Sequence, residues 1–76
     1  MKVEQSNTES VLRIDDVKAR VGLSRSAIYD KINPTSQWYD PTFPKQISLG
    51  FRSVGWLESE ISAWIQQRIS VSRGAA

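Results

Sequence analysis

The stretch "GLSRSAIYDKI", residues 22–32, carries the signals of a turn followed by a short helix. Gly22 suits the left-handed conformation in which many helices end. Ser24 is a favourable N-cap, because its hydroxyl accepts a hydrogen bond from an early backbone amide of the following helix. Ile28 and Ile32 stand one helical turn apart and form an apolar face. The stretch therefore predicts the turn and the second helix of a helix-turn-helix unit.

The residues on either side of this stretch predict where its two helices begin and end. Asp15 is expected to cap the first helix, and Asp16 adds a charge that is favourable at a helix N-terminus. Val17 and Val21 are four residues apart, so they share the buried face of that helix. Pro34 stops the second helix, because the residue before a proline avoids the helical region.

The second half of the chain has a different periodicity. Residues 45–50, "KQISLG", and 53–57, "SVGWL", alternate apolar and polar side chains, which is typical of strands. The segment between them predicts a tight turn, so the two strands form a β-hairpin with Arg52 at or near its tip. Residues 57–69, "LESEISAWIQQRI", repeat with the helical period and predict an amphipathic helix. The fold class is therefore α+β: a small winged helix-turn-helix domain.

The segment between the second helix and the hairpin, residues 33–44, contains three prolines and is expected to be irregular. Its aromatic side chains are Trp38, Tyr39 and Phe43. They are too apolar to be left wholly in water, so the loop is expected to lie across the small core. The periodicity also directs Trp56 and Trp64 inward, which favours core packing over stacking on nucleobases.

Composition limits the organisation and the chemistry of the chain. Residues 11–69 are expected to form the ordered domain, between a polar disordered lead over 1–10 and a frayed tail over 70–76. The 76 residues include no cysteine and no histidine, so no metal, cofactor or enzymatic activity is expected. The acidic pairs at the predicted helix starts are explained by capping and by the helix dipole. No apolar run approaches the roughly 18 residues that span a membrane, so we expect a cytoplasmic, nucleoid-associated protein.

The positions of the basic residues indicate a DNA-binding surface better than the net charge of +2 does. The major groove of DNA admits one α-helix, and side chains near the N-terminus of that helix read the bases. Arg25 is placed to contact guanine O6 and N7. The full predicted DNA-binding set is Ser24, Arg25, Ser26, Tyr29 and Lys31 of the second helix, with Arg52 in the hairpin turn and Lys45 before the first strand. The alternative is an ordinary amphipathic helix with solvated charges. Asp30 does not fit the proposed surface, because a carboxylate repels phosphate.

Three ordered blocks resemble the AlpA-type phage and prophage regulators, a family similar to small excisionases and to MerR-like DNA-binding domains. The blocks are "LRIDDVKARVGLSRSAIYDKI" (12–32), "DPTFPKQISLG" (40–50) and "VGWLESEISAWI" (54–65). The resemblance implies a recognition helix that carries Arg25, Ser26, Tyr29 and Lys31, and a wing that carries Arg52. The common "FPKP" of that family is "FPKQ" here, with Gln46 in place of a proline.

The resemblance also implies the partners. We expect double-stranded DNA from an attachment site or promoter region, and a phage integrase in the case of an excisionase. The sequence has no heptad for a stable dimer, so a monomer that multimerises cooperatively on DNA is expected. The alternative is a protein-interaction module that binds a polymerase subunit, an integrase or a repressor through Trp38, Tyr39 and Phe43.

Overall fold

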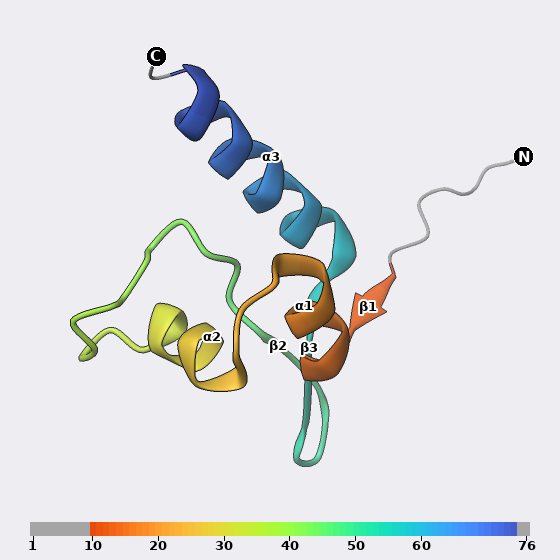
Figure 1. The fold of residues 1–76 in the computed structure, drawn as a ribbon. Coiled ribbons are helices and arrows are strands. Elements are labelled where there is room, and N and C mark those ends of the chain that lie inside the picture. Colours follow the sequence, from red (N-terminus) through yellow and green to blue (C-terminus); the bar gives the residue numbers. More distant parts are fainter. Residues whose placement is uncertain (1–9, 75–76) are drawn as a thin grey trace, which may run out of the picture.

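The computed structural model describes residues 10–74 and contains three helices and three strands in that range (Figure 1). In chain order they are β1 (Val11–Leu12), α1 (Ile14–Val21), α2 (Arg25–Ile32), β2 (Ile47–Gly50), β3 (Ser53–Leu57) and α3 (Glu58–Gly74). The predicted α+β winged helix-turn-helix fold is confirmed. The predicted disordered lead lies outside the described residues, apart from Ser10.

The turn between α1 and α2 has the conformation that its sequence predicts. Gly22 adopts φ 72° and ψ 25°, and its N–H donates to the carbonyl of Lys18 over 2.9 Å. The Ser24 hydroxyl accepts a hydrogen bond from the Ala27 amide over 3.2 Å and so caps α2. The glycine ends α1 and the serine begins α2 within three residues, which fixes the angle between the helices.

The predicted Asp15 cap of α1 is wrong. Residue Arg13 occupies the N-cap, and its backbone N–H donates to the carboxylate of Asp16 over 3.2 Å. The cause lies outside the helix: β1 pairs with β3, and this pairing continues the extended backbone as far as Arg13, with φ −91° and ψ 172°. The helix therefore begins at Ile14, two residues earlier than a cap at Asp15 would allow.

The sheet has the order β1-β3-β2, with antiparallel pairing on both sides of β3. Val11 is opposite Leu57 in one pair of strands, and Ile47 is opposite Gly55 in the other. A Cβ atom on Gly55 would lie 2.7 Å from Val11 Cγ1 and 2.9 Å from the Leu12 carbonyl oxygen. This glycine therefore permits the close approach of β1 to the centre of the sheet.

The core lies between the sheet and the three helices. Its buried side chains are Val17, Ile28, Phe43, Trp56, Ile61 and Trp64. The Trp56 indole N–H donates to the Pro44 carbonyl over 3.1 Å, and the Trp64 indole N–H donates to the Asp40 carboxylate over 3.3 Å. The two tryptophans thus attach the irregular segment to the domain, and their predicted core positions are confirmed.

The segment between α2 and β2 follows the prediction only in part. Phe43 is buried, with its ring edge-to-face on Trp64 at a centroid distance of 4.9 Å, and Tyr39 is half-buried. Trp38, in contrast, is 64% exposed, so its predicted place across the core is wrong. The segment folds as successive local turns, in which the Ser36 carbonyl accepts from the Tyr39 amide, and these turns leave Trp38 on the outside.

Helix α3 also differs from its predicted extent. It continues past Ile69 to Gly74, so the predicted frayed tail is wrong for residues 70–74. No proline or glycine interrupts residues 70–73, and Arg73 in the last turn complements the helix dipole. Within residues 10–74, no helix is long and apolar enough to cross a membrane.

Candidate nucleic-acid interface

Helix α2 begins with two exposed polar side chains, Arg25 and Ser26. The Ser24 cap holds the backbone at this end of the helix. The guanidinium carbon of Arg25 lies 5.6 Å from the centroid of the Tyr29 ring, one turn along, which is a cation–π distance. The first turn of α2 therefore presents an ordered arginine to the solvent.

Tyr29 belongs to the core as much as to the surface. Its ring is half-buried and meets the Trp56 ring edge-on, with the centroids 6.3 Å apart and an interplanar angle of 64°. The sequence places Tyr29 on the solvent-facing side of the helix, but this packing places it at the boundary. Through Tyr29 and Trp56, α2 is attached to β3, the central strand of the sheet.

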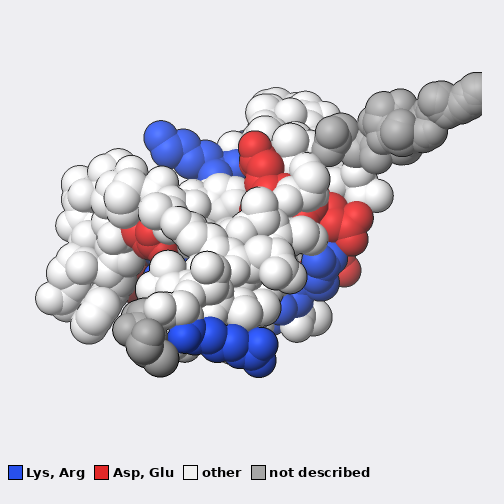
Figure 2. Space-filling model, turned by 90° about the horizontal axis from the view of Figure 1, so that it is seen from above, with Lys and Arg blue, Asp and Glu red and all other residues white. Residues whose placement is uncertain are grey.

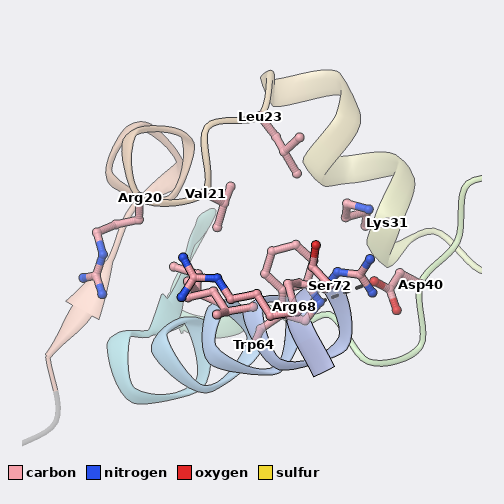
Figure 3. Close-up of a pocket in the computed structure, with 11 residues that line it drawn as sticks. Arg20, Val21, Leu23, Lys31, Asp40, Trp64, Arg68 and Ser72 are labelled. Carbon is pink, nitrogen blue, oxygen red and sulfur yellow. Dashed lines mark hydrogen bonds between the residues drawn. The ribbon is translucent and has the colours of Figure 1, made fainter. Parts of the chain in front are cut away.

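Lys31 lies on a different flank of α2 from Arg25. Its Nζ atom is 5.7 Å from the centroid of the Trp64 ring, and the side chain is half-buried. Figure 3 shows Lys31 directed toward Asp40 and α3. The structure therefore does not bring Lys31 together with Arg25 and Ser26 in one stripe.

The Asp40 carboxyl, close to Lys31, has a displaced pKa. Burial alone would raise that pKa, but several contacts stabilise the carboxylate and reverse the effect. The hydroxyl and the amide of Thr42 donate to it over 2.6 and 2.9 Å, Trp64 donates from the other side, and Lys31 adds an attractive charge. Together they lower the pKa of Asp40 below its ordinary value of 3.8.

A surface cavity of about 540 Å³ opens where α1, α2 and α3 converge (Figure 3). Its basic lining residues are Arg20, Lys31, Arg68 and Arg73. Arg20 is already engaged, because its guanidinium donates to Glu58 and to Ser62 over 2.8 Å each. Arg68 and Arg73 are not in the predicted DNA-binding set. The absence of a helix breaker before Gly74 is the signal that places Arg73 on α3.

The hairpin turn consists of two exposed residues, Phe51 and Arg52. Arg52 has φ 57°, and its guanidinium carbon lies 5.1 Å from the centroid of the Phe51 ring. Lys45 is exposed two residues before β2. Arg52 and Lys45 belong to the predicted DNA-binding set and Phe51 does not, although an aromatic residue in a two-residue turn is itself an unusual signal.

The first turn of α2 and the hairpin turn both lie along the lower side of the molecule in Figure 1. The upper face is different: its basic side chains stand apart from one another, with acidic side chains between them (Figure 2). The upper face is thus not a continuous basic surface. Among residues 10–74, no three histidine, cysteine or acidic side chains gather where they would hold a metal ion.

A capped helix that follows a tight turn, with a β-hairpin joined to it through packed aromatic rings, defines a small winged helix-turn-helix protein. The sequence identifies the group within this class. Residues 10–69 match the family model described as "Prophage CP4-57 regulatory protein (AlpA)", and the chain belongs to that family.

Two relatives extend this result. The DNA-binding transcriptional activator AlpA of Escherichia coli is 50% identical over 58 residues, which cover 76% of this chain and 83% of the relative. The uncharacterized protein ORF88 of Enterobacteria phage P4 is 40% identical over 70 residues, which cover 92% of this chain and 73% of the relative. No solved structure matches the chain significantly.

Proposed function

We propose that this protein is a sequence-specific DNA-binding regulator of transcription from a phage or prophage. The observation that carries the proposal is the start of α2, where Arg25 and Ser26 are exposed on a helix capped by Ser24. The similarity to a DNA-binding transcriptional activator supports the same function. The first turn of α2 enters the major groove, and the hairpin turn reaches the adjacent minor groove.

Each predicted contact has a distinct role in this proposal. Arg25 leaves the Tyr29 ring and donates both terminal nitrogens to guanine O6 and N7, while Ser26 reaches a base edge or a phosphate. The stacking that Arg25 gives up is worth about 0.5–1 kcal/mol at an exposed site, less than a good bidentate contact with guanine. Ser24 serves mainly as the cap of α2.

The phosphate contacts come from the flanks of the interface. In this proposal Lys31, in the last turn of α2, and Lys45, two residues before β2, contact the DNA backbone beside the groove. Arg52 at the hairpin turn adds a contact in or beside the minor groove. These contacts position the protein, and Arg25 provides the base discrimination.

The regulatory output comes from position and DNA shape. Bound copies block or recruit other proteins at a promoter, or bend an attachment site and assist an integrase, which is the action of an excisionase. The protein binds as a monomer and multimerises cooperatively on adjacent sites. Both outputs depend on the same duplex interface.

A mobility-shift assay over a series of salt concentrations tests the proposal. Duplexes from prophage attachment sites and promoters are compared with random duplexes of equal length. With about four to six phosphate contacts, the logarithm of the affinity falls with the logarithm of salt concentration at a slope of about −4 to −5. Equal affinity for every duplex, or no binding at low salt, would refute the proposal.

A second candidate function, protein interaction through the segment between α2 and β2, rests on the exposure of Trp38. Its other two aromatic residues are half-buried or buried, so the surface is smaller than the sequence predicts. A contact centred on Trp38 would survive high salt, whereas DNA binding would not. If Trp38→Ala abolishes the regulatory activity of the protein and Arg25→Ala does not, this second function is the correct one.

A further inference from the structure

Phe51 is the most exposed large apolar side chain in the described part of the chain. It is 88% exposed and occupies the turn between β2 and β3, where polar residues and glycine are usual. The other phenylalanine, Phe43, is buried in the core. No packing within the described chain therefore explains an aromatic ring at position 51.

The next residue departs from the usual turn chemistry as well. Arg52 has φ 57°, and no other residue apart from glycine has a positive φ in residues 10–74. An arginine in this conformation is strained where glycine or asparagine would not be. Local departures of this kind cluster where a function requires them. Here two unusual features are adjacent at the tip of the hairpin: the exposed ring of Phe51 and the positive φ of Arg52.

The surroundings of Phe51 favour a polyanion over a protein as its partner. Residues 45–57 include two cations, Lys45 and Arg52, and no acidic residue. The Arg52 guanidinium stacks on the Phe51 ring at 5.1 Å yet leaves that ring almost wholly in water. The tip is thus a narrow apolar ring beside a positive charge.

We propose that Phe51 is a wedge: it enters the minor groove beside Arg52, partly unstacks one base-pair step and bends the duplex. Apolar side chains act in this way in proteins that kink DNA from the minor groove. The inference rests on the proposed function, because it requires the hairpin to reach the minor groove. It adds that the wing deforms the DNA in addition to contacting it.

The wedge makes a specific thermodynamic prediction. Unstacking an intact step is costly, whereas a mismatched step is already partly unstacked. The wild-type protein therefore binds a duplex with one mismatch under the wing about tenfold more tightly than the matched duplex. Phe51→Ala loses this preference, and Phe51→Leu retains part of it because leucine remains an apolar wedge.

The experiment combines four proteins, the wild type and the variants Phe51→Ala, Phe51→Leu and Val71→Ala, with two duplexes. A site selected from a pool of random 30-base-pair duplexes is footprinted to locate the wing, and a mismatch is placed at that step. Affinities come from mobility shifts, and bending comes from energy transfer between dyes at the two ends. Val71→Ala is the matched control, because it truncates another exposed apolar side chain, on α3. The exposure of Phe51 means that its variants keep the wild-type fold.

The expected result is a bend in the wild-type complex that is absent with Phe51→Ala and unchanged with Val71→Ala. An equal bend and an equal preference for the mismatch in wild type and Phe51→Ala would overturn the wedge. A loss confined to cooperativity between neighbouring copies would also overturn it, because Phe51 would then contact protein. Failure of the wild type to bind any selected duplex would instead refute the proposed function.

Discussion

Trp56→Phe is the substitution that most directly tests how the hairpin is attached to α2. Trp56 is fully buried in β3, meets Tyr29 of α2 edge-on and donates its indole N–H to the Pro44 carbonyl over 3.1 Å. Phenylalanine keeps an aromatic ring but removes the donor and two ring carbons. The substitution therefore weakens two connections of the hairpin at once, to α2 and to the segment before β2.

The expected cost follows from these two losses. A part-buried carbonyl without its donor costs about 1–3 kcal/mol. Two missing buried carbons cost about 0.8 kcal/mol each. The sum is about 3–5 kcal/mol, against a total stability of about 4–11 kcal/mol for 76 residues. Trp56→Phe should therefore remove a large part of the unfolding free energy.

Denaturant unfolding followed by circular dichroism measures this loss, and Trp64→Phe is the matched control. Trp64 is slightly exposed, and Asp40 keeps its hydrogen bonds from Thr42 when the indole donor is lost. The control should cost about 1–2 kcal/mol. If Trp56→Phe costs less than its control, Trp56 does not hold the domain together as the structure indicates.

Three further predictions concern the turn, the sheet and the pH dependence. Gly55→Ala should lower the unfolding free energy by about 1–3 kcal/mol, because the new methyl group meets the Leu12 carbonyl oxygen at 2.9 Å; unchanged stability in urea would refute this reasoning. Ser24→Ala should cost about 1 kcal/mol through the unpaired Ala27 amide, and Ser24→Asp should restore most of the loss; thermal melting that is the same for all three proteins would exclude a role for the cap. Asp40 has a lowered pKa in the folded protein, so its contribution to stability is present above 3.8 and is lost as the pH falls through the lower folded value. Asp40→Asn should reduce this acid dependence in unfolding experiments between pH 5 and pH 2, and an unchanged pH profile would contradict the assignment.

The sequence predicts best those features whose causes are local. Gly22 and Ser24 fix the turn and the start of α2 through contacts within four residues, and both act as predicted. The two strands of the hairpin, and the inward position of Trp56 and Trp64, are also predicted from the alternation or helical spacing of neighbouring apolar residues. Local signals were therefore sufficient for the order and the type of the main elements.

The features that were mispredicted have distant causes. The start of α1 depends on the pairing of β1 with β3, more than 40 residues away, so the N-cap is Arg13 and not the predicted Asp15. Trp38 is exposed because the turns around it direct it away from the core, which composition alone does not reveal.

The central claim is that Arg25 reads a base through the first turn of α2, and a selection from random duplexes with wild type and Arg25→Ala tests it most directly. Arg73→Ala, which removes the same charge from the last turn of α3, is the control. We predict that Arg25→Ala loses the preference for one guanine at a cost of about 1–3 kcal/mol, while the control selects the wild-type sequence. An Arg25→Ala protein that binds every duplex more weakly by one common factor, with the wild-type preference intact, would contradict the claim.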